Sequence, residues 1–264
     1  MNTAENSRKA ILVVSFGTSY ETTRKVTIEA IEEEIAAAYP AYTVYRAWTS
    51  KMIIAKLKKR SLLSVDNVEE AMERMISDGV QELIVQPTHV TNGIENDAMK
   101  EDILKYKASF SSISICDPLL TSEEDKTALL QAVNEEFADL PDDTALVFMG
   151  HGTPHYANSI YAAMDYTFKD QGKGNIFMGT VEAYPDFDAV LRNVKKTGLQ
   201  KVLLAPFMIV AGDHANNDLA GDDEDSWKSR FEKEGFQVSA RLKGLGEYAK
   251  VRELFVKHIE TGIK

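Results

Sequence analysis

Short apolar runs alternate with amphipathic helical patterns along the whole chain, and this alternation constrains the fold more than any other feature. Several runs are continuously apolar, as strands buried on both faces of a parallel sheet are. Such an alternation is typical of βα units arranged around a parallel sheet. Strands are expected at Ile11–Val14, Thr43–Ala47, Leu83–Gln86, Ser112–Cys116, Ala145–Met149, Ile176–Val181, Val202–Pro206 and Gln237–Ala240.

Apolar stripes with helical spacing lie between these runs and predict helices that pack one face against the sheet. The stripes are Ile28, Ile31, Ile35 and Ala38; Val68, Ala71, Met72, Met75 and Ile76; Phe187, Val190, Leu191 and Val194; and Val251, Leu254 and Phe255. A further helix is expected after Thr121, because Ser122-Glu123-Glu124-Asp125 has the form of a capping box.

Two pairs of matching segments indicate an internal repeat. Gly79–Pro87 matches Gly198–Pro206, with glycine, glutamine and proline in register, and Val14–Thr18 matches Met149–Thr153. We therefore predict an α/β fold of two similar doubly wound parallel-sheet halves, pseudo-duplicated, around a central cleft. The halves are expected at residues 1–140 and 141–264. The alternative is that these segments match by chance, because strand-turn-helix units of α/β proteins often have similar sequences.

Composition excludes several classes of function. A formal net charge of −11 repels phosphate backbones, so nucleic acid is not expected as a partner. The first apolar run, Ile11–Val14, is too short for a signal-peptide core or a membrane span. The single cysteine, Cys116, excludes an intramolecular disulfide and a cysteine-rich metal site. We expect a cytoplasmic protein without membrane contact, and a homo-oligomer is compatible with the sequence.

Two histidines and one glutamate follow three apolar strands of the second half. His151 lies between two glycines, Glu182 comes directly after Ile176–Val181, and His214 follows another apolar run. Because ligands of such folds bind beyond the carboxyl ends of the strands, these side chains can converge on one point. Two imidazoles and one carboxylate suit Co²⁺, Fe²⁺, Ni²⁺ or Zn²⁺. Taken singly, each residue is also compatible with a turn or helix-capping role.

The two halves differ at their matched loops. Phe16 stands where His151 stands in the second half, and Glu95 stands where His214 stands. The metal chemistry is therefore expected in the second half, residues 141–264. The glycines around His151 are expected to let a large ligand approach the backbone.

The neighbourhood of His214 contains two carboxylates, of Asp213 and Asp218, either of which could orient its imidazole. The other histidines are weaker candidates. His155 lies four residues beyond the first candidate ligand and is expected only to be nearby. His258 shares the spacing of the last apolar stripe, so it is expected to be packed or at a helix end.

Several motifs in a fixed order carry a family resemblance. They are Ile11–Tyr20, Arg46–Ile54, His89–Gly93, Phe148–Gly152, Val181–Pro185, Ala211–Asp218 and Asp225–Lys228. Together they closely resemble the anaerobic sirohydrochlorin cobaltochelatases of cobalamin biosynthesis, which are class II chelatases. The likeness runs over nearly the whole chain.

The resemblance implies insertion of Co²⁺ into sirohydrochlorin, with no cofactor beyond the substrate metal ion. It implies His151, Glu182 and His214 as both the catalytic and the metal-binding residues, with His151 the favoured acceptor of pyrrole protons. The partners would be sirohydrochlorin and a divalent metal ion.

The tetrapyrrole is expected to meet the loops at the strand ends. Backbone N–H groups at helix starts there can bind carboxylates, His89 can contact a carboxylate, and Phe16 either lies against the macrocycle or packs under its loop. The expected substrate-binding residues are Ser15, Phe16, Gly17, Thr18, His89, Gly93 and Gly152.

Three alternative functions are considered for these residues. A sirohydrochlorin ferrochelatase for sirohaem synthesis would need the same ligands, and a metal or tetrapyrrole carrier would bind without turnover. A histidine-dependent phosphatase is disfavoured, because Gly150 precedes His151 where such chemistry calls for an arginine.

Overall fold

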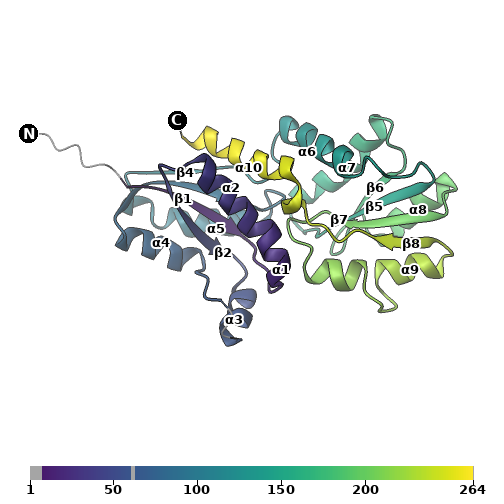
Figure 1. Cartoon of the computed structure of the whole chain (residues 1–264), viewed down its shortest axis with the longest axis horizontal. Coiled ribbons are helices and arrows are strands. Elements are labelled where there is room, and N and C mark those ends of the chain that lie inside the picture. Colours follow the sequence, from purple (N-terminus) through teal and green to yellow (C-terminus); the bar gives the residue numbers. More distant parts are fainter. Residues whose placement is uncertain (1–7, 61–62, 264) are drawn as a thin grey trace, which may run out of the picture. The chain divides into compact units, whose positions relative to one another are not determined.

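The computed structural model describes residues 8–60 and 63–263, which form two compact units (Figure 1). One unit holds the chain up to Thr121 and again from Arg252 onward, and the other spans Ser122–Val251. Within the described ranges, no helix has both the length and the apolar character needed to cross a bilayer.

Each unit is built on a four-stranded parallel sheet. The strand order is β2-β1-β3-β4 in the first unit and β6-β5-β7-β8 in the second, so the two sheets have the same topology. The strands are β1 (Arg8–Ser15), β2 (Thr43–Trp48), β3 (Val80–Pro87), β4 (Ser112–Ile115), β5 (Thr144–Gly150), β6 (Ile176–Thr180), β7 (Lys201–Pro206) and β8 (Gln237–Ala240). The α/β prediction is confirmed, and each predicted strand is present with ends shifted by a few residues.

Helices connect the strands and cover the sheets. They are α1 (Glu21–Arg24), α2 (Ala30–Ala38), α3 (Lys51–Lys59), α4 (Val68–Ser77), α5 (Ile94–Leu104), α6 (Glu123–Glu136), α7 (Ser159–Asp170), α8 (Phe187–Thr197), α9 (Trp227–Lys233) and α10 (Ala249–Gly262). The predicted capping box of α6 is present, because Ser122 Oγ accepts a hydrogen bond from the Asp125 N–H and the Asp125 carboxylate accepts one from the Ser122 N–H.

Each sheet carries its own apolar core. In the first unit, Leu12 of β1 and Val85 of β3 pack with Met72 of α4, and all three are fully buried. In the second, Val147 of β5 and Leu204 of β7 pack with Phe231 of α9. The central strands are buried on both faces, which explains their continuously apolar sequence.

The backbone beyond the strand ends repeats between the two units, which supports the pseudo-duplication. The Thr49 N–H donates to the Ser15 carbonyl (2.9 Å), as the Val181 N–H donates to the Gly150 carbonyl (3.0 Å). The bond from Ser50 N to Phe16 O (3.2 Å) corresponds to the bond from Glu182 N to His151 O (2.9 Å). The bond from Thr88 N to Val14 O (2.8 Å) corresponds to the bond from Phe207 N to Met149 O (2.7 Å). Phe16 therefore occupies the position equivalent to His151, and Ser50 the position equivalent to Glu182.

The two units do not coincide with the sequence halves 1–140 and 141–264. The last helix of the first half, α6, belongs to the second unit, and most of the last helix of the second half, α10, belongs to the first unit. Glu136 of α6 pairs with Lys243 at 2.6 Å. Arg252 of α10 pairs with Glu34 of α2 at 2.7 Å, and Figure 1 shows the yellow α10 beside α2. The residues of each pair lie far apart in the chain, so no local sequence pattern predicts these contacts.

Gly179, in the edge strand β6, has no room for a side chain. A Cβ there would lie 2.5 Å from Val190 Cγ2 and 2.8 Å from the Trp227 ring. We expect Gly179→Ala to lower the free energy of unfolding by about 1–3 kcal/mol through overpacking, measured by urea denaturation. Gly174→Ala is the matched control, because a Cβ there meets no atom within 4 Å, and its effect should stay within about 0.5 kcal/mol. Equal stabilities for the two variants would contradict this packing.

Candidate metal centre

Three consecutive strand ends of the second sheet supply the candidate ligands. β5 lies between β6 and β7, so the loops after these strands start side by side. His151 comes directly after β5, and Glu182 follows β6 by two residues. His214 follows β7 after a longer loop and precedes a short π-helical turn, Ala215–Leu219.

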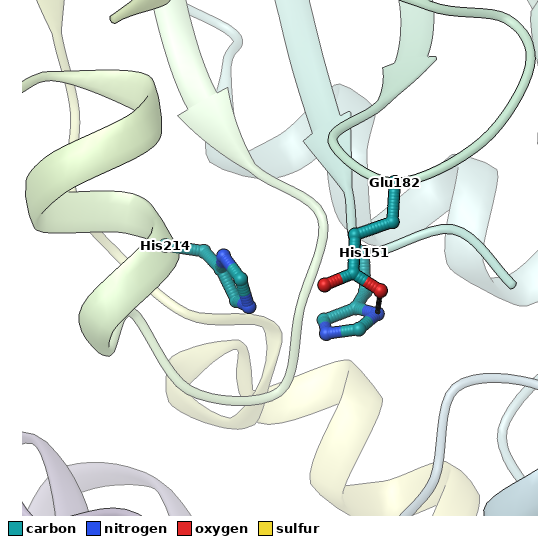
Figure 2. Close-up of side chains that lie close together, drawn as sticks. All are labelled: His151, Glu182 and His214. Atoms are coloured by element: carbon teal, nitrogen blue, oxygen red, sulfur yellow. Dashed lines mark ion pairs between the residues drawn. The ribbon is translucent and has the colours of Figure 1, made fainter.

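The structure brings these three side chains together (Figure 2). One ligand atom from each of His151, Glu182 and His214 lies within 4.8 Å of the others. The two imidazole rings are nearly perpendicular, with centroids 4.7 Å apart, and His151 Nδ1 lies 3.7 Å from Glu182 Oε2. Two nitrogen donors and one carboxylate at these separations can share a divalent ion after small side-chain movements.

The group is partly open to solvent, which suits an ion that must enter and leave. The side chain of Glu182 is 52% exposed, and those of His151 and His214 are 44% and 34% exposed. In the described part of the chain, this is the one group of three or more histidine, cysteine or acidic side chains with ligand atoms so close.

Each imidazole has a partner at Nδ1. The His214 Nδ1 lies 2.7 Å from Asp218 Oδ2, and the His151 Nδ1 lies 2.9 Å from the Gly152 carbonyl oxygen. Of the two carboxylates that the sequence offered to His214, the structure places Asp218 within hydrogen-bond distance. Where Nδ1 donates the proton to such a partner, the lone pair of the neutral imidazole is on Nε2.

The glycines around His151 allow close packing of the protein around this loop. A Cβ on Gly150 would lie 2.2 Å from the Tyr161 ring, and one on Gly152 would lie 2.9 Å from the Ala183 nitrogen. Gly152 also has φ +85°, a backbone conformation that favours glycine. The protein itself fills the space that these missing side chains leave.

The Tyr161 ring packs against Gly150, the residue directly before His151. Burial raises the pKa of its phenol to about 12, although interactions with the backbone at Gly152 and His151 oppose that rise. The hydroxyl is therefore protonated at any pH at which the protein works, and Tyr161 has a packing role.

One residue that the sequence analysis did not single out joins two of the ligand loops. The Asn158 side chain accepts a hydrogen bond from the Thr153 N–H at 3.0 Å and donates one to the Tyr184 carbonyl oxygen at 2.5 Å. The loop that follows His151 is thereby tied to the loop that follows Glu182. The Thr153 N–H is occupied by this bond and is not available to a substrate carboxylate.

The expected substrate-binding residues of the first unit differ in their exposure to solvent. Phe16 is 43% exposed at the end of β1. Ser15 and Thr18 are buried, and their hydroxyls accept hydrogen bonds from the Thr88 hydroxyl and the Tyr20 N–H. Gly17 packs against the Trp48 ring. Of these four neighbours, Phe16 presents its side chain to solvent.

His89 and Gly93 lie in the loop between β3 and α5. Gly93 is the N-cap of α5 and is buried. Both ring nitrogens of His89 are buried, and burial lowers the pKa of His89 to about 4, with a smaller opposing effect of the Asn96 side chain. His89 is therefore a neutral imidazole, not a standing positive charge for a substrate carboxylate.

The two weaker histidines lie where the sequence suggested. The His155 Nδ1 accepts a hydrogen bond from the Ala157 N–H at 3.2 Å and so caps the short turn Tyr156–Asn158. His258 is buried in α10, with Nδ1 3.1 Å from the Asp117 carbonyl oxygen.

Solved structures share this fold. The chain matches SirB from Bacillus subtilis, solved with Fe³⁺, over 97% of its length and 95% of that chain, with a TM-score of 0.64 at 14% identity. It matches CbiX, described as the terminal enzyme of sirohaem biosynthesis in denitrifying bacteria, over 97% of its length and 100% of that chain, with a TM-score of 0.60 at 16% identity. The fold is that of the class II chelatases.

Sequence relatives narrow the assignment. The chain is 38% identical, over 97% of both chains, to a sirohydrochlorin cobaltochelatase of Salmonella typhimurium. It is 28% identical, over 97% of its length and 91% of the relative, to the sirohydrochlorin cobaltochelatase CbiKC of Nitratidesulfovibrio vulgaris. The model of the cobalt chelatase (CbiK) family matches residues 9–264, and the chain belongs to this family of metal chelatases.

The buried His89 makes stability depend on pH. Its folded-state pKa of about 4 lies below the ordinary 6.5, so its contribution is fully present above pH 6.5 and is lost as the pH falls towards 4. Between pH 6.5 and 4.5 this loss amounts to roughly 2 kcal/mol. Urea denaturation at both pH values should show a smaller decrease for His89→Leu than for the wild type. The same decrease in both proteins would mean that folding does not lower the pKa of His89.

Proposed function

We propose that the protein inserts Co²⁺ into sirohydrochlorin in anaerobic cobalamin biosynthesis, in the cytoplasm and with no cofactor beyond the substrate metal ion. The observation that carries this proposal is the grouping of His151, Glu182 and His214 within 4.8 Å. It is supported by the 38% identity to a sirohydrochlorin cobaltochelatase over nearly the full length of both chains.

These three candidate ligands suit a metal ion that the protein binds and then transfers to the tetrapyrrole. Two imidazoles and one carboxylate suit a borderline divalent ion such as Co²⁺, and three protein ligands leave further coordination positions open. Ring nitrogens of the tetrapyrrole can therefore bind the ion before the protein ligands have all left. Glu182 balances part of the charge of the ion.

Insertion also requires two pyrrole N–H protons to leave the ring. The imidazole of His151 has a ring nitrogen that can accept such a proton, and Glu182 can accept or relay it. Holding the ring beside a bound ion replaces a bimolecular encounter with an oriented one.

The macrocycle needs contacts that the metal ligands do not provide. Phe16, with its exposed ring, is the side chain that we propose to contact the tetrapyrrole face. The other proposed substrate-binding residues are Ser15, Gly17, Thr18, His89, Gly93 and Gly152. We further propose that residues 1–140 and 141–264 are the two copies of an ancestral repeat, of which the second bears the metal site.

An insertion assay tests the metal centre. With sirohydrochlorin and Co²⁺ under anaerobic conditions, His151→Ala should lower kcat on the order of 10²- to 10⁴-fold, because both a metal ligand and the proton acceptor are lost. His155→Ala removes a histidine from the same loop and should retain activity close to that of the wild type. The absorbance change of the ring on metal insertion is the measurement.

The same assay separates the remaining alternatives. A carrier would bind Co²⁺ and the ring without turnover in the wild type. Faster insertion of Fe²⁺ than of Co²⁺ or Ni²⁺ would identify a ferrochelatase instead. Unchanged activity of His151→Ala would contradict the proposed site.

The proposed role of Phe16 predicts a different kinetic effect. Phe16→Ala should raise KM for sirohydrochlorin roughly three- to tenfold, since an aromatic contact contributes about 0.5–1.5 kcal/mol, while Co²⁺ binding stays unchanged. Met52→Ala is a control for loss of exposed apolar surface, because Met52 is 78% exposed in α3. If Phe16→Ala has the KM of the wild type, the ring does not rest on Phe16.

A further inference from the structure

The His214 imidazole is held by a charged acceptor. Its Nδ1 lies 2.7 Å from Asp218 Oδ2, four residues further along the chain. An ionised carboxylate only accepts hydrogen bonds, so the proton of the neutral imidazole is on Nδ1. The lone pair is then on Nε2, the nitrogen that faces the neighbouring ligands.

His151 is held differently. Its Nδ1 lies 2.9 Å from the Gly152 carbonyl oxygen, which favours the same tautomer but carries no formal charge. The Glu182 carboxylate is 3.7 Å from that nitrogen, beyond hydrogen-bond distance. Of the two histidines, only His214 has a carboxylate at hydrogen-bond distance from Nδ1.

We propose that Asp218 is a positioning residue that makes His214 the anchoring ligand of the metal ion, and that His151 is the ligand released first. A carboxylate behind an imidazole fixes its ring orientation and increases its strength as a ligand. An anchor on one side lets the ion remain bound while the other imidazole leaves it. The proposal rests on the proposed function in that the ion is taken to sit among these side chains.

The internal repeat supports this reading. Counted from the equivalent glycines Gly93 and Gly212, the first-half residue at the position of Asp218 is Met99. Met99 is 1% exposed and belongs to the apolar core of its unit. The unit without the histidine ligand also lacks the carboxylate, so ligand and partner occur as a pair.

A simple structural ion pair would behave in another way. The side chains of His214 and Asp218 are 34% and 46% exposed, and an exposed pair at this spacing adds little to stability. Loss of the carboxylate should therefore leave the unfolding midpoint nearly unchanged but weaken metal binding. These two measurements separate a positioning role from a structural one.

The experiment measures binding of Co²⁺ alone to the full chain by its visible absorption. Asp218→Asn should raise Kd by about 10- to 100-fold, the range found for partners of metal-binding histidines. Asp222→Asn is the matched control, because it removes the same charge from an exposed residue of the same unit that pairs with Lys228, and its Kd should stay within about twofold of the wild type. Asp218→Glu, which keeps the carboxylate, should recover most of the affinity.

A spectroscopic signature makes the test independent of activity. In ¹⁵N-histidine NMR of the metal-free protein, His214 should carry its proton on Nδ1 in the wild type and shift towards the Nε2–H form in Asp218→Ala, which has no acceptor at this position. An unchanged His214 tautomer together with the Kd of the wild type would overturn the positioning role.

Failure of this inference and failure of the proposed function are distinguishable. If His214→Ala loses Co²⁺ binding but Asp218→Asn does not, only the role of Asp218 is wrong. If His214→Ala binds Co²⁺ normally, both are wrong. If Asp218→Asn weakens binding as expected and the wild type inserts no Co²⁺ into sirohydrochlorin, the positioning role stands and the proposed function falls.

Discussion

The pairing of β5 with β6 on one side and β7 on the other determines where the ligand side chains lie. Backbone bonds continue this pairing past the strand ends, where the Glu182 N–H donates to the His151 carbonyl at 2.9 Å. His151 and Glu182 are thereby held next to each other by main-chain geometry, before any side chain interacts. Because parallel strands end at one edge of the sheet, the β7 loop can bring His214 to the same place.

The first sheet shows that this scaffold does not by itself make a metal site. It has the same strand order and the same bonds beyond the strand ends, yet it places Phe16 and Ser50 where the second sheet places His151 and Glu182. Ser50 instead accepts a hydrogen bond from the Ile53 N–H and caps α3. Identical backbones therefore carry different chemistry, and function here is set by the side chains at equivalent loop positions.

Much of the fold follows from local sequence, because continuous apolar runs and helical stripes determine which segments become strands and helices. The grouping of the candidate ligands was also anticipated, since strand-end loops of one parallel sheet must be neighbours. The packing of α6 and α10 was not, because partners such as Arg252 and Glu34 are more than 200 residues apart. Local patterns carry no information about such pairs.

Finer features of the site depend on side-chain geometry that residue type does not encode. Asp213 and Asp218 were equivalent candidates in the sequence, and only the helical turn after His214 places the Asp218 carboxylate beside its imidazole. His89 looked accessible in a polar loop, yet its ring nitrogens are buried. The space beside Gly150 is filled by the Tyr161 ring, and the space beside Gly152 by Ala183 and Thr180, which residue type alone does not predict.

A site with three candidate protein ligands favours transfer of a metal ion over its storage. A closed four-ligand site can hold zinc with an apparent free energy of roughly 10–16 kcal/mol, and such an ion would be slow to leave. Three ligands, one of them a half-exposed carboxylate, bind less tightly and leave room for ring nitrogens to enter. If Asp218 holds one imidazole firmly and a carbonyl holds the other less strongly, the protein ligands can leave in sequence. The ion then always keeps at least one protein ligand until the tetrapyrrole has bound it.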